Sequence, residues 1–563
     1  MSSSSSLAIS APWKDIVERK RAERASKIPK GWLLPDDIIN NRTSSPISLL
    51  HSCKLLSQTE LGLTRPETHD ATSLLQKLAT SETSSTELVT AFCKRAAGAH
   101  QLTNCLTEIL FDEAIARARE LDEYLQRTGN VVGPLHGLPI TFKDCFDIKG
   151  HDTSIGITSL CFEPSTHNSH LYDILTRHGA IVIAKTTVPQ TMLNADTDSI
   201  VFGRTVNPYN RDFAVAGSSG GEGALLALGG STLGAGTDGA GSVRMPAAVN
   251  GVVGYKPSGY RIPLDGRRVM GTGVIGSTIL GPVSVTGFLG RSVRDIILFT
   301  KLTAEARPWE KDPFIYPHPW QGLSIPAANQ LRIGVWSSNG FLHLHPPVER
   351  GFRTAQERLA KSGVELVEFK GPDISDVWEL QKEWTELQDL SYIRELLSSE
   401  PHTDIVKATA IITKKATPPP LTIEYLHSMN ARISALVRAM HSAWESATGS
   451  EDRPIDALLW VTAPHTAVPF DKYTYLGFTG LFNLIDWPAM ALPLGMFADK
   501  NIDEKVDIAP FNALDAEIHD IYDEDSFDGL PLSVQLIGRR FEDEKLLAVS
   551  EVVHGIIKHD TAN

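Results

Sequence analysis

Cysteine is scarce in this sequence, and no two cysteines are closely spaced. The chain of 563 residues contains five cysteines, an odd number without a C-x-x-C pair. This pattern gives neither a disulfide framework nor a zinc knuckle, so we expect a reducing compartment. The segment LHLHPP, residues 342–347, alternates His343 and His345 without an interleaved carboxylate, which favours a turn before Pro346 over a metal site. We therefore expect neither a metal nor a cofactor.

Long hydrophobic runs are also missing. No apolar run reaches the about 18 residues that a membrane span requires, and residues 1–25 lack the hydrophobic stretch of a signal peptide. The sequence ends in DTAN, which is not a peroxisomal targeting signal. We expect a cytoplasmic protein that does not insert into membranes.

Positive charge is in deficit, with a formal net charge of −14. Nucleic acids and anionic membranes are bound by clustered Lys and Arg side chains that replace counterions, so neither is expected as the main partner. The hydrophobic fraction of 42% and the charged fraction of 21% are ordinary for a folded, water-soluble protein. The expected partner is a neutral small-molecule substrate.

The first 70 residues are expected to form a tail and a wrapping helical segment. Residues 1–10 are serine-rich, and WKDIVERKRAERASKIP predicts a charged helix ended by Pro29. This helix lacks a strong apolar stripe, which favours a solvated face over a membrane-binding or calmodulin-binding one. We predict a catalytic domain over residues 71–563, with a helical insertion over residues 371–450 that could cap the substrate.

Helical and strand-like segments alternate along the predicted catalytic domain. Apolar residues recur at helical spacing from SSTELVTAF to DEYLQRTG, and Gly129 is expected to end the second of two helices. The runs LPITFKD and AIVIAKT predict strands on either side of the helical segment SHLYDILTRHG, and further strand signals occur at IDALLWVTA and LPLSVQLIG. This alternation predicts an α/β fold, a large single domain with a central mixed β-sheet covered by α-helices.

The glycine-rich stretch GAGTDGAGSVRMP, residues 234–246, is a candidate site. Gly234, Gly236 and Gly239 match the dinucleotide fingerprint G-x-G-x-x-G. However, no convincing strand precedes them, Pro246 follows too soon for a long helix, and no G-K-[ST] indicates a P-loop. Two interpretations remain: an oxyanion hole built from backbone N–H groups around a serine nucleophile, and a tight turn without chemistry.

Polar residues around this stretch favour chemistry over a bare turn. Asp238 and Arg244 flank the glycines at a spacing suited to ion pairing, which would fix a strained backbone in one conformation. Lys143 follows the apolar run LPITF. A lysine that enters the core at a strand end loses solvation, which lowers its pKa and allows it to act as a neutral base.

Two adjacent serines occur in AGSSGGEGALLAL. Gly217, Ser219 and Gly221 match the nucleophile elbow G-x-S-x-G, but the preceding residues PYNRD leave little room for the strand that an elbow requires. Ser219 and Glu222 instead fit the capping box S-x-x-E ahead of a helical run. We therefore interpret Ser219 as a helix cap and Ser218 as the chemically available serine.

Taken together, GLPITFKD, AGSSGGEGALLALGG and GTDGAGSVRMPAAVNGVVGYKPSGYRIP resemble the core motifs of the amidase signature family. Segments such as VGPLHGLPI, GRTVNP and VQLIGRR extend the resemblance to the fungal acetamidase-type branch over nearly the whole chain. The resemblance implies the amidase signature fold and hydrolysis of a small aliphatic, aromatic or indolic amide. It also implies a homodimer, because relatives often form one.

The same resemblance implies a Ser-Ser-Lys triad. Ser242 matches the nucleophile, Ser218 the bridging serine whose peptide bond is typically cis, and Lys143 the base. In the implied reaction Ser242 passes its proton through Ser218 to neutral Lys143, which later returns a proton to the leaving amine, and water hydrolyses the acyl-enzyme. The N–H groups implied as oxyanion donors are those of Gly239, Ala240, Gly241 and Ser242.

Three further comparisons with the family motif concern side chains near the implied site. Thr191 and Met192 match a segment whose backbone lines the acyl site in relatives. Ala240 and Ala216 replace two glycines that the family usually has. If position 240 requires a positive φ, alanine there costs roughly 1–2 kcal/mol, which bears on turnover and substrate range more than on the reaction class.

Three functions are compatible with these residues. An amidase that cleaves a carboxylic amide into an acid and ammonia or an amine is the leading hypothesis. A binding or regulatory homologue that has lost turnover is the alternative suggested by Ala240. An esterase or acyltransferase of the same fold would share the acyl-enzyme and differ in the group it cleaves or in the acceptor.

Overall fold

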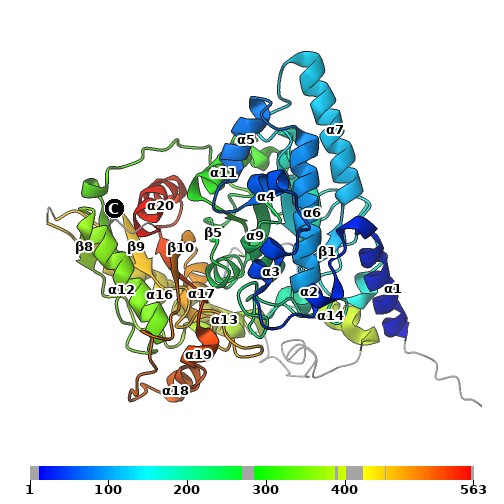
Figure 1. Cartoon of the computed structure of the whole chain (residues 1–563). Coiled ribbons are helices and arrows are strands. Elements are labelled where there is room, and N and C mark those ends of the chain that lie inside the picture. Colours follow the sequence, from blue (N-terminus) through cyan, green and yellow to red (C-terminus); the bar gives the residue numbers. More distant parts are fainter. Residues whose placement is uncertain (1–11, 269–283, 387–390, 401–421, 451, 559–563) are drawn as a thin grey trace, which may run out of the picture.

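A mixed β-sheet of eleven strands forms the centre of the molecule (Figure 1). The computed structural model describes residues 12–268, 284–386, 391–400, 422–450 and 452–558. The strand order is β1-β3-β2-β4-β6-β5-β10-β11-β9-β7-β8. The strands are β1 (Leu106–Ile109), β2 (Pro139–Lys143), β3 (Ile181–Thr186), β4 (Leu233–Asp238), β5 (Val253–Lys256), β6 (Val285–Gly290), β7 (Arg332–Val335), β8 (Glu365–Glu368), β9 (Ala457–Trp460), β10 (Ala489–Phe497) and β11 (Pro531–Ile537).

Two parallel groups of strands lie at the two ends of this sheet. Strands β3, β2 and β4 are parallel to one another, and so are β8, β7 and β9. Antiparallel pairs join the two groups through β6, β5, β10 and β11, and β1 adds antiparallel to β3. Because the halves of the chain contribute neighbouring strands to one sheet, the sheet and its helices form a single large α/β domain, which confirms the predicted fold class.

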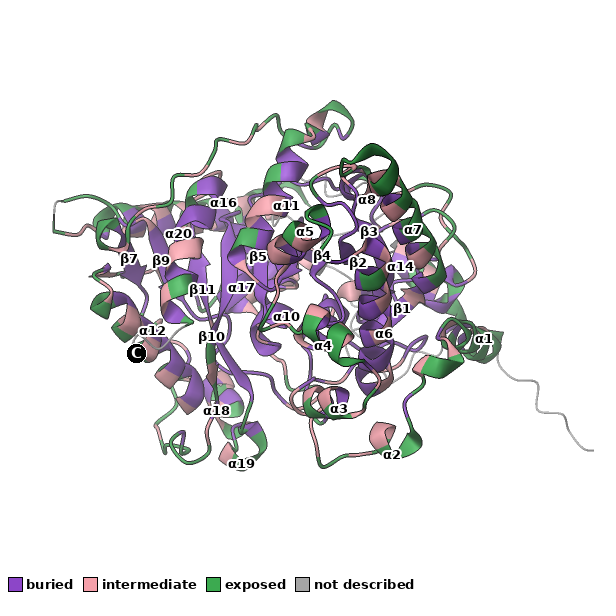
Figure 2. Ribbon diagram, turned by 45° about the horizontal axis from the view of Figure 1, so that its top comes forward, coloured by how far each residue is buried: buried purple, intermediate pink, exposed green. Residues whose placement is uncertain are grey.

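Helices cover the sheet, with buried strands inside and exposed outer helix faces (Figure 2). Helices α9 and α10 pack on the central strands, whereas α12 and α20 pack on β10 and β11. The helices are α1 (Pro12–Ser26), α2 (Asp36–Ile39), α3 (Pro46–Ser52), α4 (Gln58–Thr64), α5 (Ala71–Ala79), α6 (Ser85–Thr103), α7 (Phe111–Thr128), α8 (His170–Arg177), α9 (Gly220–Ala227), α10 (Arg244–Val249), α11 (Val293–Glu305), α12 (Pro346–Lys361), α13 (Val377–Glu386), α14 (Ser391–Leu396), α16 (Ile423–Ser446), α17 (Gly477–Leu484), α18 (Ala513–Asp520), α19 (Glu524–Phe527) and α20 (Asp543–Ile557).

The predicted elements of the first half are confirmed. Helix α7 ends at Gly129, whose φ of 68° is the left-handed conformation expected of a C-cap glycine. Strands β2 and β3 and helix α8 lie where the apolar runs placed them, and β9 and β11 occupy the two later strand signals. Strand β1 lies between α6 and α7 and was not predicted. Within the predicted cap at 371–450 the described residues form α13, α14 and α16, and residues 401–421 lie outside the described part.

Helix α1 has the predicted position, but the predicted solvated face is wrong for its central cations. Lys20 is 3% exposed, and its ammonium lies 2.6 Å from a Glu108 carboxylate oxygen and 2.7 Å from one of Asp152. Arg21 and Arg24 donate hydrogen bonds to backbone carbonyls of the loop at 200–201 and of β1. These contacts anchor the helix to the body of the protein, because burial of a charged side chain is costly unless it is paired or hydrogen-bonded.

The glycine-rich stretch begins as a buried strand, β4, between β2 and β6, although no strand was predicted there. Helix α9 packs so closely on β4 that a Cβ atom on Gly236 would lie 2.9 Å from Ser219 Oγ, and one on Gly234 would overlap with the Glu222 carboxylate. Glycine normally weakens a strand, and here it makes room for a neighbouring helix. The parallel strands β2 and β4 therefore end side by side, at Lys143 and Asp238.

Candidate active site

Lys143, at the carboxyl end of β2, is completely buried and contacts two hydroxyl groups. Its Nζ lies 2.6 Å from Ser218 Oγ and 2.7 Å from Thr237 Oγ1. Burial lowers the pKa of Lys143 to about 8, because the charged form loses its water. A substantial part of this amine is therefore neutral near physiological pH, and a hydroxyl that contacts it can transfer a proton to it.

Ser218 and Ser219 lie at the start of α9. The peptide bond between Gly217 and Ser218 is cis, and the Ser218 side chain points to Lys143. Ser219 occupies the N-cap position of α9, but the predicted capping box is wrong, because its side chain makes no cap hydrogen bond. Its hydroxyl lies 3.4 Å from the carbonyl of Thr237, and its N–H donates to the carbonyl oxygen of Ser242 at 3.1 Å. Ser219 therefore ties the two serine segments together.

Glu222, the other member of the predicted capping box, points into the sheet. Its carboxylate accepts hydrogen bonds from Thr141 Oγ1 at 2.7 Å and from Thr186 Oγ1 at 2.9 Å. Burial raises the pKa of Glu222 to about 8, since a charged carboxylate is poorly solvated there. The S-x-x-E pattern was misleading because β2 and β3 supply hydroxyl partners that a local reading of the sequence does not reveal.

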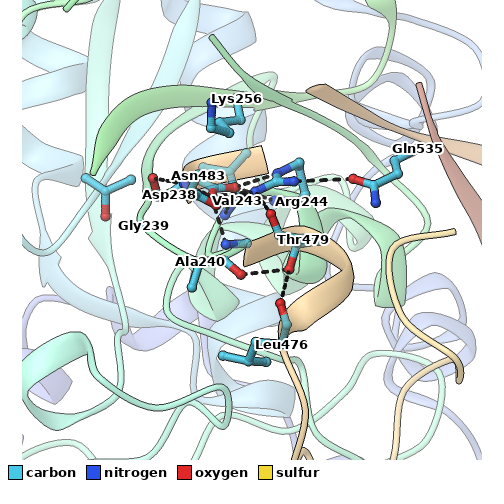
Figure 3. Close-up of polar contacts among 12 residues, drawn as sticks. Asp238, Gly239, Ala240, Val243, Arg244, Lys256, Leu476, Thr479, Asn483 and Gln535 are labelled. Carbon is cyan, nitrogen blue, oxygen red and sulfur yellow. Dashed lines mark hydrogen bonds and ion pairs between the residues drawn. The ribbon is translucent and has the colours of Figure 1, made fainter. Parts of the chain in front are cut away.

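Asp238 and Arg244 form a fully buried ion pair across the turn between β4 and α10 (Figure 3). The guanidinium donates to both Asp238 carboxylate oxygens at 3.0 Å. The same carboxylate accepts hydrogen bonds from the backbone N–H groups of Gly241, Val243 and Arg244, at 2.8, 3.2 and 3.3 Å. Burial alone would raise the pKa of Asp238, but the charge and hydrogen bonds of Arg244 outweigh it and lower the pKa to about 2. A permanent carboxylate therefore folds the loop around itself.

Residues 238–242, from Asp238 to Ser242, are called the signature loop. The implied oxyanion donors differ within it: the Gly241 N–H donates to Asp238 Oδ1 at 2.8 Å, which argues against Gly241 as an oxyanion donor. The N–H groups of Gly239, Ala240 and Ser242 have no acceptor among the described residues. These three residues are also partly accessible, whereas Gly241 is buried. Three of the four implied donors are therefore available. They belong to Ser242 itself and to two of the three residues before it.

The strain considered for Ala240 does not arise. Ala240 does not have a positive φ; in the signature loop it is Gly241 that has one, at 122°, and a Cβ there would overlap with Thr479. The alanine with a left-handed backbone is Ala216, with a φ of 56°. Such a conformation costs an L-residue about 1–2 kcal/mol, so the strain lies in the segment before Ser218 rather than in the signature loop.

Ser242 is partly accessible, directly before the first residues of α10. Its side chain makes no hydrogen bond to Ser218 or to any other described residue. The site therefore combines an accessible hydroxyl, three free backbone donors and, behind Ser218, an amine with a lowered pKa. These are the parts that attack on a carbonyl carbon requires: a nucleophile, a proton relay and donors for the developing oxyanion.

Thr191 and Met192 lie in a short 3-10 turn after β3, Gln190–Met192. Both have left-handed backbones, with φ of 68° and 64°. The Thr191 N–H donates to the carbonyl of Ile155 at 3.1 Å. The following residues touch the serine segment, since a Cβ on Gly217 would lie 2.5 Å from the carbonyl oxygen of Asn194. The structure thus brings the residues after this turn to the serine segment.

Four residues of the site were not singled out from the sequence. Thr237 contacts Lys143 directly, and its position in the motif just before Asp238 was the available signal. Gln381, Thr479 and Asn483 come from α13 and α17 and bind carbonyl groups of the signature loop. No local pattern marks these three, because only the packing of distant helices brings them to the loop.

Metal and membrane features are absent from the described ranges. Among those residues no cluster of three or more His, Cys, Asp or Glu side chains could hold a metal ion. His343 and His345 lie at the start of α12 and are bonded to Asp515 and to the carbonyl of Ile518. In the same part of the chain, no helix has the length and apolar character needed to cross a membrane.

Known proteins resemble this chain in sequence and in fold. A family model described as Amidase matches residues 87–547. An amidase of Gibberella moniliformis is 36% identical over 97% of this chain and 99% of its own length, and an acetamidase of Emericella nidulans is 36% identical over 96% and 97%. Among solved structures, a fatty acid amide hydrolase superposes with a TM-score of 0.89 at 29% identity, covering 98% of this chain and 96% of that one.

Proposed function

Because this chain belongs to the amidase family and is a hydrolase of carbon–nitrogen bonds in amides, we propose that it works through a Ser242–Ser218–Lys143 triad and an acyl-enzyme. The observation that carries the proposal is the 2.6 Å contact between Lys143 Nζ and Ser218 Oγ at a fully buried strand end. Burial lowers the pKa of this amine to about 8, and two hydroxyl groups contact it. A lowered pKa together with such partners is typical of a base in an active site.

In the proposed reaction, a proton moves from Ser242 through Ser218 to Lys143 and then back to the leaving nitrogen. Ser242 Oγ attacks the amide carbon while its proton passes to Ser218 and the Ser218 proton to neutral Lys143. The carbonyl oxygen becomes negative and accepts hydrogen bonds from the free N–H groups of the signature loop. The carbon–nitrogen bond then breaks as the leaving nitrogen takes a proton back from Lys143 through Ser218. Water repeats the sequence on the ester and releases the acid.

The test of this proposal is covalent labelling. A fluorophosphonate should modify the protein at Ser242, and the Ser242→Ala variant should be unlabelled and lose turnover. Equal labelling of that variant would refute the assignment of the nucleophile. Lys143→Ala should remove turnover near neutral pH while the protein remains folded.

The substrate is proposed to be a small aliphatic, aromatic or indolic amide. The family membership supports this class, and two of the relatives carry the names acetamidase and fatty acid amide hydrolase, which differ widely in acyl group. A hydrolysis screen across acetamide, benzamide, indole-3-acetamide and longer acyl amides would rank them by kcat/KM. Cleavage of any of them would also reject the alternative of a binding homologue without turnover. Strain at Ala240 does not support that alternative, because Ala240 does not have a positive φ.

A further inference from the structure

Each peptide unit of the signature loop is held on its carbonyl side. Three of the four carbonyls are held by side chains from helices outside the loop, and one by the start of α10. The acceptors and donors are Asp238 O and Asn483 Nδ2 at 3.0 Å, Gly239 O and Gln381 Nε2 at 2.7 Å, Ala240 O and Thr479 Oγ1 at 2.7 Å, and Gly241 O and Met245 N at 2.8 Å.

These bonds determine where the N–H groups point. In a trans peptide the carbonyl and the N–H of the next residue point in opposite directions. A donor that holds the carbonyl of Gly239 therefore aims the N–H of Ala240 away from itself. Among the three accessible N–H groups, that of Ala240 is the one whose direction depends on Gln381, which lies 142 positions further along the chain than its acceptor Gly239.

Gln381 is built into the structure for this contact. Its side chain is 4% exposed, on the inner face of α13, and its amide fits between the signature loop and α17. The fit depends on Gly480 in α17, because a Cβ atom there would overlap with Gln381 Oε1. Glycine inside a helix costs about 1 kcal/mol relative to alanine, so this position gives up helix stability for the space that Gln381 fills.

We propose that Gln381 is a positioning residue for the reaction, which holds the Ala240 N–H in the direction needed to bind the oxyanion. This inference rests on the proposed function of the signature loop. Gln381 belongs to the helical segment predicted to cap the substrate, so the cap and the oxyanion donors are mechanically connected through one hydrogen bond. An N–H that is already aimed requires no reorganisation when charge develops on the carbonyl oxygen.

The first test replaces the amide by a side chain of similar length without a donor, Gln381→Met. Loss of a whole oxyanion donor lowers kcat by about 10²- to 10³-fold, and misdirection of one of three donors should lower it by about 10- to 100-fold. KM for a neutral amide should change little, because the oxyanion forms only in the transition state. The matched control is Lys382→Met, which introduces the same side chain at the next, more exposed position of α13 and should leave kcat unchanged.

The second test disturbs Gln381 without replacing it. Gly480→Ala should favour the helix but push the Gln381 amide from its place, so kcat should fall as it does in Gln381→Met. In the double variant the two effects should not multiply, because both remove the same hydrogen bond. A multiplied loss would contradict the proposal.

The third test is a pH profile of Gln381→Glu. A protonated carboxyl can donate to the Gly239 carbonyl, whereas an ionised one cannot and repels it. The ratio of variant to wild-type kcat should therefore fall as pH rises, although wild-type activity rises with pH in the range where Lys143 loses its proton. A ratio that does not change with pH would overturn the proposal, as would a Gln381→Met variant with wild-type kcat.

Failure of this inference is distinguishable from failure of the proposed function. If Ser242→Ala loses labelling and turnover while Gln381→Met keeps both, the triad stands and the positioning role is rejected. If Ser242→Ala keeps turnover, the proposed function is rejected whatever the Gln381 variants do. Equal losses in Gln381→Met and Lys382→Met would assign the effect to a general disturbance of α13 and also reject the positioning role.

Discussion

Lys143 and Lys256 are both completely buried, and burial lowers the pKa of each to about 8, yet their surroundings differ. Lys143 contacts the hydroxyls of Ser218 and Thr237. Lys256, at the end of β5, donates to the backbone carbonyls of Pro257 and Trp487, both at 3.0 Å, and lies 3.9 Å from Asp486. The lowered pKa alone therefore does not distinguish a base from a structural cation.

The partners make the distinction. A hydroxyl can both accept and donate a hydrogen bond, so Lys143 keeps suitable contacts whether it is charged or neutral and can exchange a proton with Ser218. A carbonyl only accepts, so Lys256 serves its partners as a donor and has no proton to receive from them. This difference in partners fits the proposed role of Lys143 as a base. It indicates a structural role for Lys256, which joins the residue after β5 to a residue just before β10.

The largest expected effect is on turnover, and it should occur at one lysine only. Lys143→Met should lower kcat for a neutral amide by about 10²- to 10⁴-fold, the usual contribution of a general base. Thermal unfolding of this variant should show a folded protein, because methionine fills the space and removes a buried charge. The same replacement at Lys256 is the matched control. Comparable kcat losses in the two folded variants would break the comparison.

The architecture of the site region could be predicted from the sequence only where local patterns carry it. The runs before Lys143 and after His178 predict strands, and the segment just before His178 shows helical periodicity, so β2, β3 and α8 followed from them. Strand β4 was missed because its glycines have low strand propensity. They are needed there to make room for Glu222 and Ser219 of the α9 segment. The pattern of a strand was hidden by a packing requirement that is visible only in three dimensions.

The same limit applies to the residues around the site. Ion pairing of Asp238 with Arg244 was expected from their spacing, and the pair is present. The S-x-x-E pattern led to a cap that does not form, since Glu222 finds hydroxyl partners on two strands. Gln381 carries no local signal, because its role depends on a contact over a separation of 142 residues. Residues within local motifs could be singled out from the sequence, whereas distant residues that hold those motifs in place could not.

The next effect is on stability, and it should occur at the other lysine. Lys256→Met leaves the carbonyls of Pro257 and Trp487 without their donor, and an unsatisfied buried group costs about 1–3 kcal/mol. Relief of the buried charge offsets part of this loss. Urea unfolding should therefore show a free energy of unfolding lower by about 1–3 kcal/mol, with kcat of the folded protein retained. An unchanged stability would remove the structural role assigned to Lys256.

The pH dependence of that stability has a defined sign. The folded-state pKa of Lys256 lies near 8, below the ordinary value of 10.5, so between these values the unfolded chain binds more protons than the folded one. The free energy of unfolding should therefore rise with pH across this window. Lys256→Met should remove its share of the rise and leave the share of Lys143. A rise of the same size in wild type and variant would contradict the lowered pKa of Lys256.

A smaller effect is expected at the second hydroxyl partner of Lys143. Thr237→Val keeps the shape of the side chain and removes the group that contacts Nζ at 2.7 Å. A hydrogen bond of this kind contributes about 1 kcal/mol, so kcat should fall by roughly fivefold while Ser218 still relays the proton. Single-turnover kinetics would measure the effect on the chemical step. A loss as large as that of Lys143→Met would mean that Thr237 rather than Ser218 relays the proton.

The smallest effect should appear in the pH profile. Because the proposed base Lys143 can accept a proton only when it is neutral, kcat/KM should rise with pH and level off above about 8. Burial lowers the pKa of Lys143, and the charge of Glu222, whose own pKa burial raises to about 8, opposes that shift. Glu222→Gln should move the midpoint to lower pH, whereas Lys256→Met should leave it close to its wild-type value. A midpoint that follows Lys256 instead of Glu222 would reverse the assignment of the two lysines, because the ionisation that limits turnover would then belong to the lysine that contacts only carbonyls.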